Sequence, residues 1–337
     1  MTTSEKENIS KAISDGTDYL RNKVLSGNYG LSCIGNDGTP KFSNSKGHLF
    51  SIFHIVNALK GEINEIERTI FLTRILSEEY EGAWGYSPRG YYRQEGYNPF
   101  FVDSDDTSFA LRTLRALDVY RSNDVLMKFK CTFIYDSREY DGFSTFITNH
   151  QSRELSSTPS FENNFQTHPE VNANVFHALS NSNYDHLINE SLINFSQNDD
   201  GSWTSFFYPN AYYGTWQFMS LLQQRGIMQP CFDKGMSFLV KSQNKNGSWG
   251  ENGDVYCTAM AIKAMCTNKN NITERNNTIN YLLNTQHQNG SWKTTEKIWQ
   301  FHDQEGDLWS AFDTNDVITT AVCVEALKNS LESKNYQ

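Results

Sequence analysis

The sequence predicts an all-α protein, a single (α/α)6 barrel domain built from six helical hairpins over residues 1–337. Three observations predict this fold. The turn Q-x-x-x-G-x-W begins at Gln197, Gln243 and Gln286, each turn lies between two stretches with helical apolar spacing, and strand signals are nearly absent. Weaker versions of the turn occur at 28–30, 82–85 and 141–143. Because repeated hairpins bury their apolar faces by stacking on neighbours, six of them predict a closed ring.

In chain order, each hairpin is expected to consist of an outer helix followed by an inner helix. The expected outer helices are 8–25, 62–79, 122–133, 184–196, 231–242 and 274–285. The expected inner helices are 45–59, 103–118, 170–180, 210–224, 254–266 and 314–329. Ring closure would surround the inner helices on all sides, which explains why they are almost continuously apolar.

The turn residues have a structural interpretation. The glycine permits a positive φ or a close backbone approach. The tryptophan offers a large flat surface to wedge between neighbouring hairpins, and the glutamine can bond across the turn. We therefore expect these turns to build the fold and not to carry chemistry.

Two long segments interrupt the pattern of short turns. Residues 144–168 are polar, and residues 293–313 contain Trp299, Phe301, His302, Trp309 and Phe312. Long segments inside a compact domain are often functional. The second one is interpreted as an ordered cover over a cavity mouth, or alternatively as a surface loop packed on its own side chains.

Composition excludes several classes of protein. The 337 residues have a formal net charge of −10 and no basic run, which argues against non-specific binding of nucleic acid. No apolar run is long enough for a transmembrane helix, and the N-terminus lacks the apolar core of a signal peptide. The six cysteines include no C-x-x-C pair. We expect a cytoplasmic protein, monomeric or weakly dimeric, with at most transient membrane contact.

The sharpest chemical feature is D-S-D-D-T at residues 103–107, at the start of the second inner helix. One aspartate there would be explained by helix capping. Three carboxylates within four residues exceed that need, and they cannot all ionise cheaply beside an apolar space. The group is therefore expected to keep a proton, and a neutral aspartic acid in a dry site is a proton donor.

D-x-D-D-T together with Q-x-x-x-G-x-W turns resembles the class II terpene cyclases, which include squalene–hopene cyclases and copalyl diphosphate synthases. The repeats extend this resemblance over nearly the whole chain. It implies that Asp105, the middle aspartate, protonates the end of a linear polyprenyl chain, with Asp103 and Asp106 as supporting carboxylates. It also implies that Asn174 hydrogen-bonds the acid, with Asn172 as the runner-up. An amide N–H orients the acid and stabilises the carboxylate left after proton transfer, although capping of the third inner helix would also account for both residues.

The chain has the length of one barrel, whereas familiar members of the family have two. It is therefore closest in size to the single-domain merosterolic acid synthase type. That resemblance implies a geranylgeranyl chain attached to an aromatic acid, and no cofactor. A prenyl diphosphate substrate of the copalyl or drimenyl type is the alternative, and Mg²⁺ would accompany that head group.

Aromatic residues make up 14% of the chain and have a use in such a reaction. Aromatic faces stabilise carbocations without reacting with them. The candidates for substrate contact lie near the starts of inner helices, and core packing is the competing interpretation for each: Trp84, Phe109, Phe207, Tyr212, Tyr213, Trp216, Tyr256, Trp309 and Phe312. His168 is the candidate base, and a phenol of the substrate is a second way to end the cascade.

Other chemistries match the sequence less well. Class I terpene synthase motifs are incomplete, and the D-x-C zinc motif of prenyltransferases is absent, so no metal site is expected. A carbohydrate-active barrel would pair Asp105 with Asp316 or Glu170. A non-catalytic barrel that binds a lipid is the remaining alternative.

Overall fold

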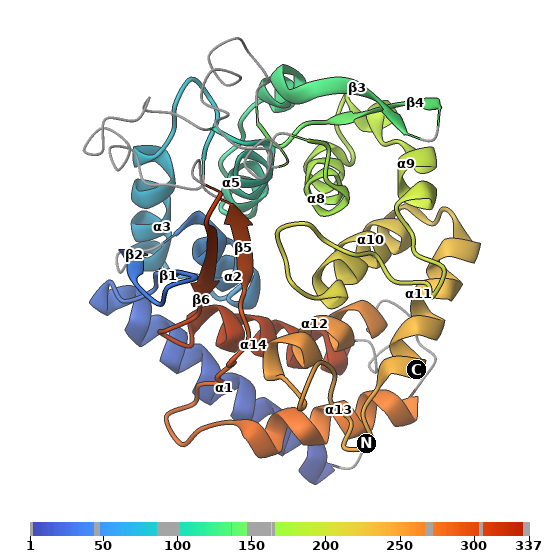
Figure 1. The fold of residues 1–337 in the computed structure, drawn as a ribbon. Helices are drawn as coiled ribbons and strands as arrows, with labels where there is room; N and C mark the ends of the chain where they lie inside the picture. The colour runs from blue at the N-terminus through green and yellow to red at the C-terminus, as the bar shows by residue number, and fades with distance from the viewer. Residues whose placement is uncertain are drawn as a thin grey trace.

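Six helices form a closed inner ring in the computed structural model, which describes residues 3–43, 48–85, 102–135, 137–146, 163, 166–266, 272–302 and 306–332. The inner helices are α2 (Leu49–Ala58), α5 (Ser104–Ala116), α8 (Pro169–Leu179), α10 (Ala211–Arg225), α12 (Val255–Met265) and α14 (Val317–Glu332). Each packs against the next, and α14 packs against α2, so the ring closes (Figure 1). The predicted (α/α) barrel is confirmed.

An outer layer surrounds this ring. It contains α1 (Thr3–Ser26), α3 (Glu65–Ser77), the 3-10 helix η1 (Asn123–Phe129), the 3-10 helix η3 (Asp185–Leu187), α9 (Glu190–Phe195), α11 (Gln229–Ser242) and α13 (Ile272–Thr285). The prediction of a helix over 122–133 is wrong, because η1 gives way to strand β3 (Lys130–Tyr135). The β-branched and aromatic residues from Thr132 to Tyr135 favour an extended backbone and explain the change. The outer helix expected at 184–196 is likewise reduced to η3 and the short α9.

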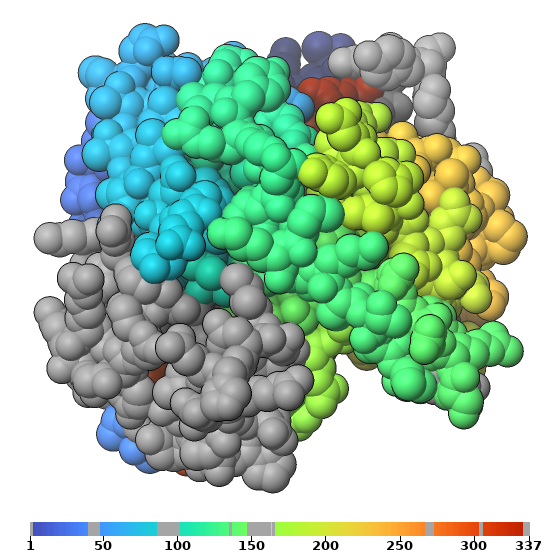
Figure 2. All heavy atoms as spheres, turned by 90° about the horizontal axis from the view of Figure 1, so that it is seen from above, coloured from blue at the N-terminus to red at the C-terminus, as the bar shows by residue number. Residues whose placement is uncertain are grey.

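Strand signals are nearly absent from the sequence, and the described residues contain only short strands. β3 pairs with β4 (Arg138–Phe143), and Figure 2 shows this green hairpin extending past its neighbours at one side of the molecule. A second sheet has the order β2-β1-β6-β5, with strands Pro40–Ser43, Ser32–Gly35, Leu308–Phe312 and Trp299–His302. Residues 299–302 and 308–312 thus form a hairpin paired to β1. The short strands are additions to the barrel and do not alter its helical architecture.

The Q-x-x-x-G-x-W turns have the structural roles expected for them. The Nε2 atoms of Gln197, Gln243 and Gln286 each donate to the carbonyl of the turn glycine and to a carbonyl of the next outer helix. The turn glycines have φ values of 95° at Gly201, 86° at Gly247 and 85° at Gly290. The turns therefore join each outer helix to the next around the ring.

Tryptophan and threonine form a second repeated contact. The indole N–H of Trp203 donates to the carbonyl of Ile193, and its backbone N–H donates to the Thr215 hydroxyl on α10. The same two bonds recur at Trp249, Trp292 and Trp84. At Trp84 the threonine partner is Thr107, the last residue of the D-S-D-D-T motif. The repeat thus explains this threonine as a structural residue.

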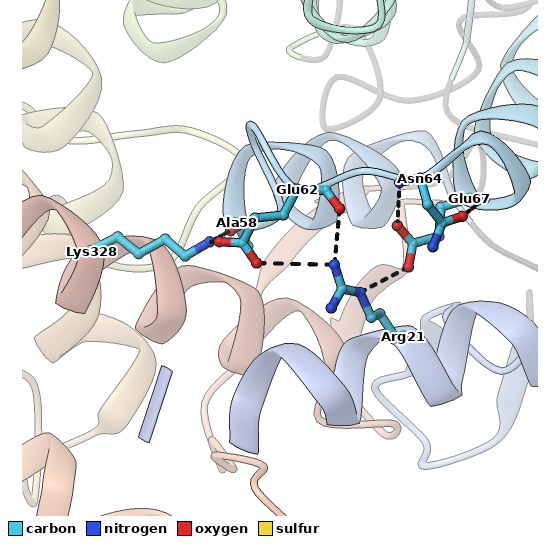
Figure 3. A network of polar contacts seen from close by, with 6 residues as sticks. All are labelled: Arg21, Ala58, Glu62, Asn64, Glu67 and Lys328. Atoms are coloured by element: carbon cyan, nitrogen blue, oxygen red, sulfur yellow. Dashed lines mark hydrogen bonds and ion pairs between the residues drawn. The ribbon is translucent and has the colours of Figure 1, made fainter. Parts of the chain in front are cut away.

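Charged groups connect the beginning and the end of the chain (Figure 3). Arg21 on α1 forms a 2.9 Å ion pair with the buried Glu67 on α3 and donates to the carbonyl of Glu62. Lys328 on α14 donates to the carbonyl of Ala58 and pairs with the Glu62 carboxylate. These contacts close the ring between the last inner helix and the first two hairpins. Within the described residues, no helix combines the length and the apolar character needed to cross a bilayer.

Candidate active site

The three aspartates at the start of α5 differ in their surroundings. Asp103 is the N-cap, and its Oδ1 accepts a 2.6 Å hydrogen bond from the backbone N–H of Asp106. Asp103 and Asp106 are 3% and 5% exposed, whereas Asp105 keeps more accessible surface. Of the three aspartates, Asp105 is therefore the one with the most accessible surface.

Two donors hold the Asp105 carboxyl group. The side-chain Nδ2 of Asn174, on α8, donates to Asp105 Oδ1 at 2.6 Å. The hydroxyl of Tyr208, just before α10, donates to Oδ2 at 3.4 Å. The structure therefore brings together Asp105 and Asn174, which the family resemblance paired, and adds Tyr208.

The orientation of Asn174 is set by polar groups behind it. Its Oδ1 accepts 2.7 Å hydrogen bonds from Arg112 Nη1 and from Gln217 Nε2. Its Nδ2 also donates to the Tyr213 hydroxyl, which accepts from Gln217 as well. Because Arg112 has only donors, the amide oxygen must face it and the amide nitrogen must face Asp105.

The electrostatic environment favours a proton on this group of acids. Although Asp105 has accessible surface, the protein atoms packed around its carboxyl group raise its pKa to about 7, and the bonds from Asn174 and Tyr208 and the charge of Arg112 oppose this rise. Burial and the charges of Asp103 and Asp105 raise the pKa of Asp106 well above its usual value. Burial lowers the pKa of Arg112 to about 10, so Arg112 stays charged at neutral pH. Burial and mutual repulsion thus favour a proton on this group of acids, although the charged Arg112 lies nearby.

Aromatic rings form a cluster beside the acid. Phe50 on α2 contacts Phe109 at 5.3 Å, Tyr208 at 5.8 Å and Tyr213 at 6.2 Å between ring centroids. Tyr208 and Tyr213 stack at 3.6 Å, and Trp216 meets Tyr213 edge-on at 5.7 Å. Tyr256 on α12 is fully buried and interacts electrostatically with Tyr213. Four of the aromatic candidates, Phe109, Tyr213, Trp216 and Tyr256, therefore belong to one cluster near Asp105.

Three other candidates lie in packing positions. Trp84 is fully buried and makes the bonds of the turn tryptophans. The Asn172 amide donates to the carbonyls of Phe143 and His168 and accepts from the N–H of Phe143, so it ties α8 to β4. Tyr212 packs at 5.8 Å against Phe238 on the outer helix α11. Accordingly, these three are not among the residues that we propose to contact substrate.

His168 and Glu170 begin α8. The His168 ring has two polar partners: its Nδ1 lies 2.7 Å from the Thr145 hydroxyl, and the ring also bonds to the backbone of Asn163. Burial lowers the His168 pKa to about 3, so the ring is neutral, and it stacks on Phe206. Glu170 is completely buried, and burial raises its pKa to about 7. Asp316, the other acid considered for a pair, has different charged neighbours, namely Lys293, His287 and Lys23.

The segment 293–313 reaches the same end of the barrel through the hairpin β5–β6. The N–H of Gln300 in β5 donates to the carbonyl of Phe207 at 2.7 Å, directly before Tyr208. Phe207, Trp309 and Phe312 each keep some accessible surface, and the ring of Trp309 packs on Phe301 at 5.3 Å. This hairpin therefore adjoins the segment that places Tyr208 on the acid.

Sequence reasoning did not identify Arg112, Gln217 or Tyr208. Arg112 follows Asp105 by seven residues and Gln217 follows Tyr213 by four, spacings that put each pair on one helix face. That spacing was a usable signal for both. Tyr208 lies in an irregular segment, where no periodicity indicates direction.

The family model of the squalene–hopene cyclase C-terminal domain matches residues 81–302. The squalene–hopene cyclase of Zymomonas mobilis is 30% identical over 115 residues, which cover 29% of this chain and 18% of that protein. The chain thus matches less than a fifth of the length of this relative.

Two solved structures share the fold. A variant of the type II terpene cyclase MstE from Scytonema, in complex with geranylgeranyl dihydroxybenzoate (substrate), has a TM-score of 0.74 at 16% identity, covering 98% of this chain and 100% of that one. The ent-copalyl diphosphate synthase of Streptomyces platensis has a TM-score of 0.60 at 19% identity, covering 86% of this chain and 52% of that one. The barrel and its connectivity are thus common to both proteins.

Proposed function

The chain belongs to the squalene–hopene cyclase C-terminal domain family, and from this premise we propose that it is a class II terpene cyclase with Asp105 as its general acid. The observation that carries the proposal is the state of Asp105. It has accessible surface, a pKa of about 7, and a hydrogen bond from Asn174 that is in turn oriented by Arg112. A carboxyl group that keeps its proton up to about pH 7, beside aromatic rings, has a proton available for transfer to an alkene.

The proposed reaction is an isomerisation. Asp105 gives its proton to the terminal double bond of a linear polyprenyl chain, and the cation that forms is attacked by the next double bond, so that carbon–carbon bonds close rings in sequence. Asn174 and Tyr208 donate to the carboxylate left on Asp105, and Arg112 supports Asn174 with its charge. Asp103 and Asp106 are the proposed supporting carboxylates: Asp103 caps α5 through the N–H of Asp106, and the charges of Asp103 and Asp105 raise the pKa of Asp106.

The aromatic cluster is proposed to stabilise the cation as it moves. Phe109, Tyr213, Trp216 and Tyr256 offer ring faces, and Phe207, Trp309 and Phe312 at the β5–β6 hairpin are proposed to exclude water from it. The final cation loses a proton or is captured by a hydroxyl of the substrate. His168 is less suited to accept that proton than its sequence position indicated, because burial lowers its pKa to about 3 and Nδ1 already lies against the Thr145 hydroxyl.

We propose a geranylgeranyl chain attached to an aromatic acid as the substrate. The support is the likeness over nearly the whole of both chains to MstE, a variant of which was solved in complex with geranylgeranyl dihydroxybenzoate as substrate. We further propose that the whole chain acts as one cytoplasmic domain, monomeric or weakly dimeric, without a cofactor.

A prenyl diphosphate is the second candidate, favoured by the shared fold of ent-copalyl diphosphate synthase. A diphosphate head group would bring Mg²⁺ with it. Among the described residues, no cluster of three or more His, Cys, Asp and Glu side chains is suited to a metal ion, and we derive no step through one.

The test is incubation of the purified protein with geranylgeranyl dihydroxybenzoate and with geranylgeranyl diphosphate, each with and without Mg²⁺, followed by mass spectrometry and NMR of the products. We expect cyclised products of unchanged mass from the benzoate and loss of that product in Asp105→Asn. Turnover of the diphosphate alone would replace the proposed substrate, and a folded Asp105→Asn protein with normal turnover would contradict the proposed acid.

A further inference from the structure

Glu170 is a buried acid whose carboxyl group is directed at the backbone of a distant segment. It lies in the first turn of α8, and its Oε1 accepts hydrogen bonds from the backbone N–H groups of Phe206 at 2.8 Å and Phe207 at 2.9 Å. Its Oε2 is buried and has no hydrogen-bond partner among the described residues. A buried carboxylate oxygen without a partner is costly, which indicates that the position is retained for more than packing.

The segment bound by Glu170 leads directly to the acid. Phe206 and Phe207 pack on the His168 ring, and the carbonyl of Phe207 accepts from Gln300 in β5. The next residue, Tyr208, stacks on Tyr213 and donates to Asp105 Oδ2. Glu170 thus anchors one side of the segment, β5 anchors the other, and Tyr208 follows immediately.

We propose that Glu170 is a positioning residue, which holds the backbone at Phe206 and Phe207 so that the Tyr208 hydroxyl meets Asp105, and whose negative charge helps Asp105 to keep its proton. This inference rests on the proposed function. It adds a residue from α8 that acts on the acid in two ways, through Tyr208 and through its charge.

The second effect follows from the mutual repulsion of the two acids when both are ionised. The charge of Asp105 raises the pKa of Glu170, while the bonds from Phe206 and Phe207 favour its ionised form. When two nearby carboxyl groups share a site, ionisation of the first makes the second hold its proton more firmly. Other titratable and charged groups surround the pair. They are Asp103, Asp106 and Arg112 at α5, His168 at the start of α8, Tyr208 just before α10, and Tyr213 on α10. Glu139 and Asp141 of β4 are exposed to solvent.

Substitutions separate the two effects. Glu170→Gln keeps an oxygen that can accept from both N–H groups but removes the charge, whereas Glu170→Ala removes both. Tyr208→Phe removes the hydroxyl that reaches Asp105. Glu190→Gln, at an exposed position at the start of α9, is the matched control.

We expect Glu170→Gln to retain most of the turnover at low pH and to move the alkaline limb of the kcat profile to lower pH by about one unit. Glu170→Ala is expected to lose about tenfold or more in kcat with little change in KM. Adding Tyr208→Phe to Glu170→Ala is expected to cost little more, because both changes remove the same contact. An unmoved pH profile in Glu170→Gln together with additive losses in the double variant would overturn the proposal.

Hydrogen–deuterium exchange distinguishes failure of this inference from failure of the proposed function. If the wild-type protein cyclises no polyprenyl substrate, the proposed function fails, but exchange at residues 205–210 still tests the anchor. Faster exchange there in Glu170→Ala, and not in Glu190→Gln, supports the anchor. Equal exchange in all three proteins contradicts it.

Discussion

The side-chain nitrogen of Asn174 lies 2.6 Å from Oδ1 of Asp105, and the oxygen of the same amide accepts from Arg112 at 2.7 Å. The Arg112 guanidinium and the Asp105 carboxyl group, both on α5, are therefore connected through the Asn174 amide on the neighbouring helix α8. Before proton transfer, these hydrogen bonds hold the carboxyl group in place. After transfer, they stabilise the new carboxylate, because each donor already points at the developing charge.

Replacing Asp105 by Asn should abolish cyclisation while leaving the fold intact. The amide keeps the size of the side chain and can accept from Asn174, but it has no acidic proton to give. We expect turnover to fall on the order of 10³-fold or more. Asp103→Asn and Asp106→Asn should reduce turnover less, because these residues cap the helix and tune the acid. Product formation by the three variants, with melting temperatures measured in parallel, checks the order.

Removing the charge behind Asn174 should slow the reaction without removing the acid. Arg112→Met leaves the Asn174 oxygen with only the bond from Gln217 and frees the amide to turn away from Asp105. The loss of a charged hydrogen bond of about 2 kcal/mol corresponds to roughly a 30-fold lower kcat. Asn174→Ala should cause a similar or larger loss. Single-turnover kinetics measure both variants. A kcat equal to that of the wild type in either one would contradict the role of the hydrogen bonds from Arg112 to Asn174 and from Asn174 to Asp105.

The β5–β6 hairpin offers a test of product control. Trp309→Ala removes an accessible ring from this hairpin, so water should enter the site and give partly cyclised or hydroxylated products. Tyr120→Ala, at a residue that is 75% exposed, serves as the aromatic control. Chromatography of the products decides the matter, and an unchanged product distribution with only a lower melting temperature would assign Trp309 to packing.

The sequence predicted the ring and the acid because both depend on local patterns. The Q-x-x-x-G-x-W turns occur within seven residues, and Asp105 is part of a contiguous motif. The sheet of β1 and β6 was missed because Cys33 pairs with Ala311, far away in the sequence, and strands of four or five residues have no clear periodicity. Trp84 makes the structural bonds of the turn tryptophans, and composition near a helix start could not decide between that role and substrate contact.

Turn glycines should differ sharply in their tolerance of alanine. At Gly290 the backbone has a φ of 85°, and an added Cβ would lie 2.2 Å from the carbonyl oxygen of Asp15 on α1. At Gly61 the φ is 81°, but no atom lies within 4 Å of the added Cβ. Gly61→Ala should therefore cost only the strain of a positive φ, about 1 kcal/mol, whereas Gly290→Ala should cost about 3 kcal/mol or more. Urea unfolding of both variants measures the difference, and equal losses would show that the turn does not depend on close packing against α1.

Activity and stability should depend on pH in linked ways. Proton donation needs Asp105 protonated, and its pKa is about 7, so kcat should fall as the pH rises through about 7. Stability follows from the difference between folded and unfolded chains. In the unfolded chain Asp105 has its ordinary pKa of 3.8, whereas burial in the folded protein raises this pKa to about 7. Between these values the folded state binds more protons than the unfolded state, so the free energy of unfolding decreases as the pH rises.

Asp105→Asn removes this pH-dependent decrease in the free energy of unfolding, because an amide does not titrate. The variant should therefore match the wild type in stability near pH 4 and exceed it by a few kcal/mol, on the order of the linkage free energy, at pH 8. Urea unfolding at the two pH values measures the effect, with Glu190→Gln as a control that should follow the wild type at both. The inactive variant would then be the more stable protein above neutral pH, as expected if the fold holds a proton on Asp105 at a cost in stability. A variant no more stable than the wild type at pH 8 would mean that Asp105 is already ionised there without penalty, and that the acid lies elsewhere.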